Sequence, residues 1–189
     1  MILYLHGFRS SPASMKARLM QQAMQQAGRA HEFICPQLPA SPRLAIELSL
    51  QLAADCDASN LTVIGSSLGG FYATYLAEQL GCRAVLLNPA TKPPRDLSGY
   101  VGVTTLYHSE EVFEFKEEYV HELPLYAVEK ITRPDRYFLI AATGDEVLDW
   151  REMVTHYPGA KQLVIQGSDH GISAFSDYIG QVMAFCDAP

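Results

Sequence analysis

A serine flanked by glycines has the spacing expected of a catalytic nucleophile. The run reads Gly65-Ser66-Ser67-Leu68-Gly69 and lies between a β-branched segment and a segment with helical periodicity. In a G-x-S-x-G turn the glycines leave room for a backbone crossing, and the central serine adopts a strained conformation that exposes its hydroxyl. Because the pattern is short, its interpretation depends on whether the chain also supplies a base, an acid and an oxyanion hole.

The predicted base is His170. A serine hydroxyl is a poor nucleophile unless a base removes its proton, and a third group must fix the tautomer of that base. His170 follows the predicted strand 162–166 in a glycine-flanked loop at the carboxyl end of the sheet, where this chemistry requires it. The remaining histidines, apart from His6, lie where a solvated or packing role is expected: His31, His108, His121 and His156.

Three carboxylates follow the predicted strand 136–142 and compete for the role of the acid. Asp149 has a separate explanation, because Asp149 and Glu152 have the spacing of a capping box for the next helix. Glu146 is expected to face solvent. Asp145 directly follows a glycine at the strand end and is therefore the predicted acid.

Two backbone N–H groups are expected to form the oxyanion hole. One belongs to Leu68, at the N-terminus of a helix whose dipole favours negative charge. The other belongs to Phe8, in a loop after the first strand that Gly7 allows to turn. His6 is expected to brace this loop rather than to transfer protons. Arg9, at the lip of the site, is either solvated or meets an anionic group of the substrate, and solvation is favoured.

The composition is that of an acidic globular chain. Its 189 residues, 48% apolar and 19% charged, are enough for a single domain with a sizeable core. The formal net charge of −7 argues against nucleic acid as a partner. No segment approaches the roughly 20 consecutive apolar residues of a membrane span.

The cysteine pattern and the start of the chain predict a cytoplasmic protein. The cysteines are widely spaced and follow no metal-ligand pattern, so free thiols in a reducing compartment are expected. They are Cys35, Cys56, Cys82 and Cys186. The chain begins directly with a strand pattern rather than with the basic and apolar regions of a signal peptide.

Strands and helices alternate along the chain. Strands are predicted at residues 2–5, 32–35, 61–65, 82–87, 136–142 and 162–166. Helices are predicted at about residues 12–27, 42–56, 68–80, 150–157 and 173–186, the first two beginning at Ser11-Pro12 and Ser41-Pro42. This alternation predicts an α/β fold of three layers, with a mostly parallel six-stranded sheet covered by helices on both faces.

Residues 91–134 form an insertion between the fourth and fifth predicted strands of a single domain, 1–189. A structureless loop of this length is improbable, so part of it, about residues 114–130, is predicted to be helical. The insertion is rich in aromatic residues and glutamates. It is either a cap whose apolar side chains line an acyl pocket, or a surface excursion that packs on the sheet edge; the cap is favoured.

Six motifs in order resemble the small bacterial YqiA-type esterases of the α/β-hydrolase superfamily. They read YLHGF at 4–8, ICPQLP at 34–39, GSSLGG at 65–70, LNPA at 87–90, TGDEVLD at 143–149 and SDH at 168–170. The resemblance covers essentially the whole chain. It implies a trimmed α/β-hydrolase sheet, with Ser67 as nucleophile, Asp145 as acid and His170 as base. It also implies hydrolysis of carboxylic esters, including acyl thioesters.

The predicted reaction is therefore acyl transfer from a small-molecule ester or thioester, through an acyl-enzyme on Ser67. It requires no metal and no cofactor. An acyl-CoA thioesterase is the alternative among enzymes, with residues 91–134 accommodating the pantetheine arm. A binding protein that keeps the fold without the chemistry is the alternative of a different class. A peptidase is less expected than an esterase, because a chain this short offers little scaffold to grip a polypeptide.

Overall fold

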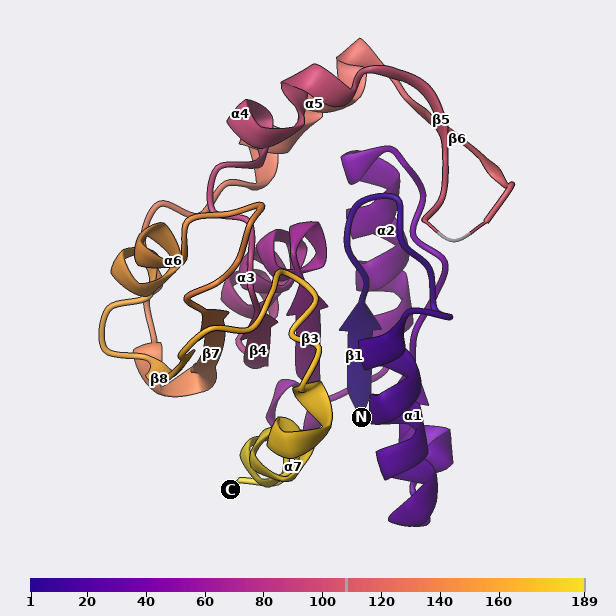
Figure 1. Ribbon diagram of the computed structural model, residues 1–189. Helices are drawn as coiled ribbons and strands as arrows, with labels where there is room; N and C mark the ends of the chain where they lie inside the picture. The colour runs from indigo at the N-terminus through magenta and orange to yellow at the C-terminus, as the bar shows by residue number, and fades with distance from the viewer. Residues whose placement is uncertain (108, 189) are drawn as a thin grey trace.

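Six parallel strands form the central sheet (Figure 1). The computed structural model describes residues 1–107 and 109–188. In sheet order the strands are β2 (Phe33–Ile34), β1 (Ile2–Leu5), β3 (Thr62–Ser66), β4 (Arg83–Leu87), β7 (Tyr137–Ala142) and β8 (Lys161–Ile165). Strands β1, β3 and β7 are buried along their whole length, as expected where a parallel sheet is covered on both faces.

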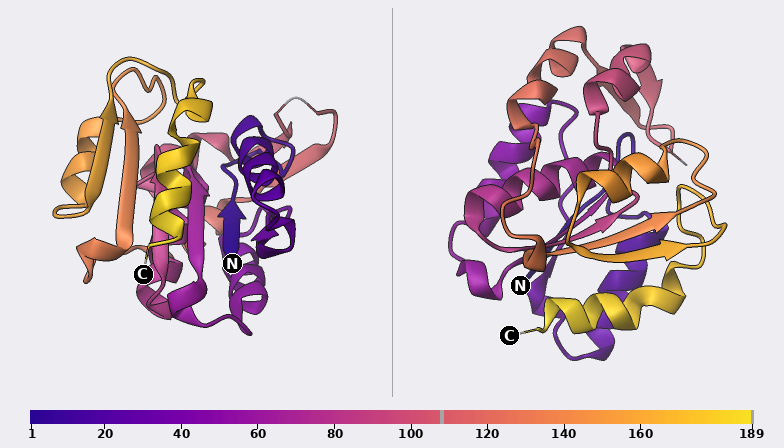
Figure 2. Two further views of the ribbon diagram at one scale, coloured as in Figure 1. Left: turned by 90° about the horizontal axis from the view of Figure 1, so that it is seen from below. Right: turned by 90° about the vertical axis from the view of Figure 1, so that its left-hand side faces the viewer.

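Helices cover both faces of the sheet, which confirms the predicted three layers. One face carries α1 (Met15–Gln26) and α7 (Ile179–Cys186), and the other carries α2 (Pro42–Ala53), α3 (Leu68–Leu80) and α6 (Trp150–His156). In the right-hand view of Figure 2, α7 lies below the sheet and α6 above it. Successive strand residues point to opposite faces, so Leu3 packs with the second group of helices and Tyr4 with the first.

The two serine–proline pairs start their helices differently. Ser41 Oγ accepts a hydrogen bond from the N–H of Leu44 at 3.2 Å, and α2 begins at Pro42 as predicted. The predicted N-cap at Ser11 is wrong. Ser11 Oγ accepts from the N–H of Ala13 at 3.2 Å in a turn, and α1 begins only at Met15. Serine followed by proline favours a turn as well as a helix start, so this pattern alone could not predict where α1 begins.

Residues 91–134 connect β4 to β7, and their helices and hairpin lie beyond the carboxyl ends of the strands (Figure 1). Their elements are α4 (Pro93–Leu97), the antiparallel hairpin of β5 (Gly102–Thr105) and β6 (Val112–Phe115), and α5 (Glu117–Glu122). The predicted helix at 114–130 is largely wrong, because its first residues belong to β6 and a short 3₁₀ turn, Leu123–Tyr126, follows α5.

The hairpin replaces the predicted helix for a reason visible in the packing. Phe113 and Phe115 are two residues apart, so a strand places both on one face. Both rings contact Phe8, with centroids 5.2 Å and 5.0 Å from its own. A helix would turn these two side chains apart and lose one of the contacts.

The four cysteines are free thiols, as predicted. Burial raises the pKa of Cys82 to about 11 and that of Cys186 to about 12, which keeps both protonated at neutral pH. Among the described residues, no helix has both the length and the apolar character needed to cross a bilayer.

Candidate active site

Ser67 occupies a strained turn between β3 and α3. Its backbone has φ 54° and ψ −120°, a combination that residues other than glycine rarely adopt. The N–H of Ser67 donates to the carbonyl of Leu87 at 3.0 Å, and the N–H of Ala90 donates to the carbonyl of Ser67 at 3.0 Å. A Cβ atom on Gly65 would collide with the backbone of Gly69, so the crossing requires glycine. This is the turn that the G-x-S-x-G pattern predicts.

The structure brings Ser67, His170 and Asp145 into one hydrogen-bonded chain. The Ser67 Oγ to His170 Nε2 distance is 3.0 Å, and His170 Nδ1 lies 2.8 Å from Asp145 Oδ2. The Asp145 side chain is fully buried, and its Oδ1 accepts from the N–H groups of Val147 and Leu148, both at 2.8 Å. A carboxylate fixed by these donors can hold the imidazole with Nδ1 protonated, which leaves Nε2 as the acceptor for the serine proton.

Of the other two candidate carboxylates, Asp149 is engaged elsewhere. Asp149 Oδ1 accepts from the N–H of Arg151 at 2.9 Å and caps α6, as predicted. The predicted capping box is nevertheless incomplete. Glu152 contacts Lys92 and Arg95 instead, each at 3.0 Å, and these two residues belong to the segment 91–134. Glu152 therefore ties that segment to α6.

Asn88 joins the loop of His170 to the sheet, a role that sequence reasoning missed. Its side chain is fully buried. Nδ2 donates to the carbonyls of Asp169 (3.1 Å) and His170 (3.0 Å), while Oδ1 accepts from the N–H of Ala142 at 2.8 Å. Because this buried amide makes all of these directional hydrogen bonds, it fixes the position of the His170 loop relative to the sheet. The feature of the sequence that could have indicated this role is the polar residue of the LNPA run, Asn88, at the end of the fourth strand.

Two charged side chains hold the same loop. Glu146 is exposed as predicted, but its Oε2 also accepts from the backbone N–H of His170 at 3.0 Å. Lys16, on α1, donates from Nζ to the carbonyl of Gly171 at 2.7 Å. Burial lowers the pKa of Lys16 to about 8. No local sequence pattern indicates this role of Lys16, because its partner lies 155 residues away.

His6 braces the loop after β1, as expected. The ring is buried, its Nδ1 lies 3.0 Å from the carbonyl of Gly7, and its Nε2 lies 3.0 Å from the N–H of Leu38. A neutral ring protonated on Nδ1 satisfies both bonds, donating to the first and accepting from the second. Burial lowers the pKa of His6, which favours this neutral form.

Arg9 is half-buried and is bound to residues 91–134. Its Nε donates to the carbonyl of Thr105 at 2.8 Å, and its guanidinium carbon lies 4.6 Å from the ring centroid of Tyr107. The favoured expectation of a solvated Arg9 is therefore incomplete, because a hairpin that the sequence did not predict binds this side chain. Arg9 instead ties the loop after β1 to residues 91–134.

The predicted oxyanion donors lie close to Ser67 and come from two different elements. Leu68 is the first residue of α3, and Phe8 follows Gly7, where an added Cβ atom would lie 3.2 Å from the Cβ of Ser67. Leu68 and Phe8 line the same cavity as Ser67 and His170. Within the part of the chain that the structure describes, the N–H groups of Phe8 and Leu68 donate to no protein acceptor. Both are therefore available to a ligand.

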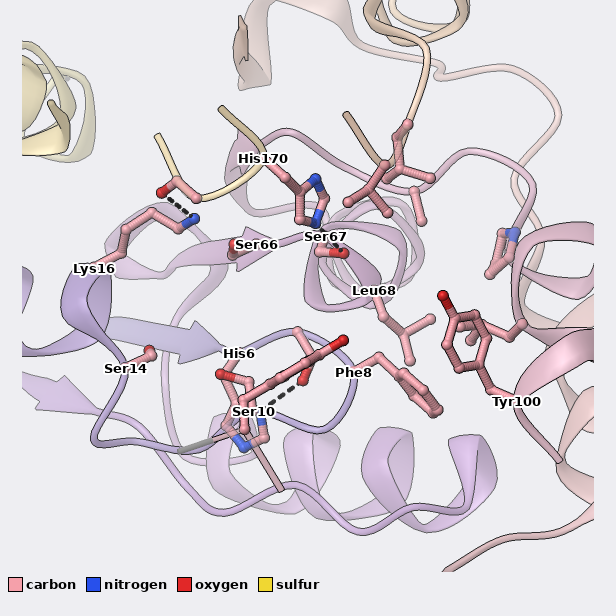
Figure 3. A pocket seen from close by; sticks show the side chains of 18 of the residues that line it. His6, Phe8, Ser10, Ser14, Lys16, Ser66, Ser67, Leu68, Tyr100 and His170 are labelled. Carbon is pink, nitrogen blue, oxygen red and sulfur yellow. Dashed lines mark hydrogen bonds between the residues drawn. The ribbon is translucent and has the colours of Figure 1, made fainter. Parts of the chain in front are cut away.

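A cavity of about 560 Å³ opens over Ser67 (Figure 3). This volume is within the range of about 300–1,000 Å³ that small-molecule sites occupy. Part of its wall is apolar and comes from Phe8, Leu68, Leu97 and Tyr100. Of these, Leu97 and Tyr100 belong to residues 91–134. No group of three or more His, Cys, Asp or Glu side chains among the described residues is arranged to hold a metal ion.

Of the remaining histidines, those that the structure describes do not line this cavity. His31 and His121 are exposed, and His156 packs against the ring of Tyr157 with centroids 4.8 Å apart. Burial lowers the pKa of His156. These three positions agree with the predicted solvated and packing roles, and His108 lies outside the described residues.

The sheet order, the strained serine turn after β3, and a carboxylate and a histidine after β7 and β8 define the α/β-hydrolase fold. Solved structures share it. A candidate hydrolase from Agrobacterium vitis S4 has a TM-score of 0.77 at 17% identity, covering 98% of this chain and 87% of its own. Alpha/beta hydrolase domain-containing protein 10 from mouse has a TM-score of 0.72 at 16% identity, with coverages of 97% and 89%.

A third structure with this fold is Est1E from Butyrivibrio proteoclasticus with ferulic acid bound. Its TM-score is 0.69 at 14% identity, covering 97% of this chain and 87% of its own. More specifically, the chain belongs to the Uncharacterised protein family (UPF0227), which it matches over residues 1–187. This membership confirms the resemblance to the YqiA-type family.

Proposed function

We propose that the protein is a serine hydrolase that cleaves carboxylic esters through an acyl-enzyme intermediate. The observation that carries the proposal is the chain of hydrogen bonds from Ser67 through His170 to Asp145. These hydrogen-bonded side chains border a cavity that is large enough for a small ester. The α/β-hydrolase fold of the chain supports the same conclusion, since that fold positions a nucleophile, a base and an acid at these strand ends.

In the first half of the proposed reaction, His170 Nε2 accepts the proton of Ser67 Oγ while this oxygen attacks the ester carbonyl carbon. The carbonyl oxygen becomes an oxyanion and accepts hydrogen bonds from the N–H groups of Phe8 and Leu68. The protonated His170 then donates its proton to the leaving alkoxide. An acyl ester remains on Ser67.

In the second half, a water molecule loses a proton to His170 and attacks the acyl carbon. The same two N–H groups stabilise the second oxyanion. When this intermediate collapses, His170 returns its proton to Ser67 Oγ and the carboxylic acid is released. Asp145 stays ionised throughout and stabilises the imidazolium form of His170.

We further propose that residues 91–134 act as a cap on a single domain. Leu97 and Tyr100 reach the wall of the cavity, which supports the cap over a surface excursion. Hydrolysis of a series of p-nitrophenyl esters from acetate to decanoate tests this role. Replacing Leu97 by Trp should shorten the acyl chain of the best substrate, whereas an unchanged preference would contradict a cap that lines the acyl pocket.

Replacement of Ser67 by Ala tests the nucleophile. Loss of a triad serine lowers turnover by about 10⁴-fold or more, so Ser67→Ala should abolish measurable hydrolysis of p-nitrophenyl butyrate. A fluorophosphonate probe should label Ser67 in the folded wild-type protein. Ser66→Ala is the matched control, because Ser66 is the neighbouring serine that the motif does not select. Activity in Ser67→Ala, or an adduct on another residue, would contradict the assignment.

A thioester substrate fits the same mechanism, because a thiolate leaves in place of the alkoxide. Comparing kcat/KM for butyryl-CoA with that for butyl butyrate separates the two substrate classes. A binding protein without chemistry is the remaining alternative. It would show no fluorophosphonate adduct and no turnover of either compound.

A cytoplasmic location accompanies this proposal. All four cysteines are free thiols, and such thiols are typical of reducing compartments. Fractionation of cells expressing the tagged chain should recover the activity with cytosolic markers, and recovery with periplasmic or extracellular markers would contradict this location.

A further inference from the structure

The cavity over Ser67 has two unlike ends (Figure 3). Phe8 and Tyr100 stand at the apolar end, and Ser10, Ser14 and Lys16 stand at the opposite, polar end. Ser67 lies between them. An ester that spans the cavity therefore presents one half to hydrocarbon and the other half to hydroxyls and an ammonium group.

The ammonium group of Lys16 is buried without an ion pair. Lys16 is 9% exposed, and among the described residues its side chain donates one hydrogen bond, to the neutral carbonyl of Gly171 at 2.7 Å. The carboxylates that influence it most are occupied, since Asp145 binds His170 and Asp169 binds the side chain of Ser173 at 2.6 Å. Within the described part of the chain, Lys16 therefore has donor capacity that no carboxylate uses. A buried charge in this state is costly unless a counter-ion joins it.

The start of α1 adds to the positive potential at this end. Ser14 is the N-cap residue, but its side chain makes no capping hydrogen bond, and the first turn contains no acidic residue. The unpaired N–H groups and the dipole of a 12-residue helix favour an anion here. Burial lowers the pKa of Lys16 to about 8, so most Lys16 side chains are still charged at pH 7.

We propose that the substrate ester carries a carboxylate, which Lys16 and Ser14 bind at the polar end of the cavity while the apolar end receives the other half of the ester. This inference rests on the proposed ester hydrolysis. Lys16 then determines specificity, since it contacts the substrate away from the reacting atoms. The carbonyl of Gly171 keeps one donor of the ammonium group, and the substrate carboxylate takes the donors that remain.

Two matched pairs of esters test the proposal with the intact chain. The first pair places the charge on the acyl half: the mono-p-nitrophenyl ester of glutaric acid against p-nitrophenyl pentanoate. The second pair places the charge on the alcohol half: the butyrate ester of glycolic acid against propyl butyrate. Hydrolysis of these two esters is measured by the release of protons. We expect kcat/KM to favour the charged member of one pair by about 10- to 100-fold, the effect of one charge-assisted hydrogen bond.

Lys16→Met should lower this preference at least tenfold, because it keeps the length of the side chain but removes the charge. Arg18→Met is the matched control, since Arg18 is an exposed cation on the same helix, and it should keep the wild-type preference. Ser14→Ala provides a second variant whose fold does not depend on the hydroxyl, and it should lower the preference about threefold or more.

Two results would overturn the inference. One is the absence of a charge preference in both pairs with an active wild-type enzyme. The other is an equal loss for charged and neutral esters in Lys16→Met, which would make Lys16 only an anchor for Gly171. If the wild type hydrolysed none of the four esters and took up no fluorophosphonate, the proposed function itself would fail, and that outcome is distinct from both.

Discussion

The two walls of the cavity over Ser67 are held together by different interactions. The wall on the sheet is fixed by buried, directional hydrogen bonds, of which those of Asn88 and Asp145 are examples. The wall from residues 91–134 is held largely by ring contacts to Phe8 and by the ion pairs of Glu152 near solvent, with a few hydrogen bonds such as those from Arg9 to Thr105 and from Ser41 to Glu122.

This difference fits the role that we propose for each wall. Proton transfer between Ser67 and His170 requires heavy atoms about 3 Å apart in a fixed orientation, and only directional bonds in a buried setting maintain that. A wall that contacts hydrocarbon needs shape alone. Ring contacts tolerate small rearrangements, so residues 91–134 can differ in conformation or sequence without disturbing the site of reaction.

The largest effect is expected on the sheet wall, from Asn88→Asp. The substitution removes the two donors to the His170 loop and places a carboxylate beside two carbonyls. We expect about 100-fold slower hydrolysis of p-nitrophenyl butyrate, since a displacement of about 1 Å has this effect. We also expect a loss of about 2–4 kcal/mol in the free energy of unfolding. Both quantities are measured against Asn60→Asp, a substitution at an exposed position that should change neither of them. Wild-type turnover in Asn88→Asp would contradict the conclusion that buried hydrogen bonds fix the wall on the sheet.

The next largest effect is expected where the two walls meet, from Phe8→Ala. The ring contacts Tyr100, Phe113 and Phe115, so its removal should lower the free energy of unfolding by about 2–3 kcal/mol. It should also lower kcat/KM about tenfold, because the ring packing positions the backbone N–H at residue 8, the proposed oxyanion donor, and this N–H shifts when the ring is removed. Phe33→Ala, on β2, is the control: it should lower stability without lowering kcat/KM. Equal kinetic effects in both variants would place Phe8 outside the site.

A smaller, pH-dependent effect is expected for Glu152→Gln. Lys92 and Arg95 lower the pKa of Glu152 from 4.5 to about 2. Because the folded pKa is the lower one, the ion pairs stabilise the protein above pH 4.5, and this stabilisation is lost as the pH falls toward 2. We expect Glu152→Gln to lower the free energy of unfolding by about 0.5–1 kcal/mol at pH 7 in low salt, a value limited by solvent screening.

Urea unfolding at pH 7, 5, 4 and 3 measures this difference, which should shrink below pH 4.5. Glu117→Gln, at an exposed position of α5, should show no such trend. A difference for Glu152→Gln that stays constant down to pH 3 would mean that the ion pairs do not hold residues 91–134 to α6.

The smallest effect is expected on the outer face of the hairpin. Val112 is 69% exposed, whereas Phe115 on the same strand is fully buried. Val112→Ser should therefore change the free energy of unfolding by less than about 0.5 kcal/mol and leave ester hydrolysis unchanged. Thermal unfolding and the butyrate assay check both. A loss above about 1 kcal/mol would mean that this face is covered in solution.

The strands and most of the covering helices could be predicted from the sequence, because each is encoded by local periodicity and by glycine or proline at its ends. The positions of Ser67, Asp145 and His170 could be predicted for the same reason. Each lies in the turn or loop that follows a strand, and the carboxyl ends of parallel strands lie at one edge of the sheet. The start of α1 could not be predicted, since Ser11-Pro12 suits a turn and a helix equally well.

The hairpin at 102–115 escaped prediction because its conformation depends on Phe8, a residue almost a hundred positions earlier. Phe113 and Phe115 carry β-strand propensity, but the glutamates around them favour a helix, and only the contact with Phe8 decides between the two. Tertiary packing often overrides weak local preference in this way.

By itself, the sequence determined the order of the strands and helices, the strained turn at Ser67 and the three side chains that meet there, because hydrophobic periodicity and glycine positions act over a few residues. Only the tertiary structure decided the path of residues 91–134 and the partners of Asn88, Lys16 and Glu152. Those partners lie 81, 155 and 60 residues away along the chain. Contacts at such separations arise from packing of the whole chain, and no local pattern records them.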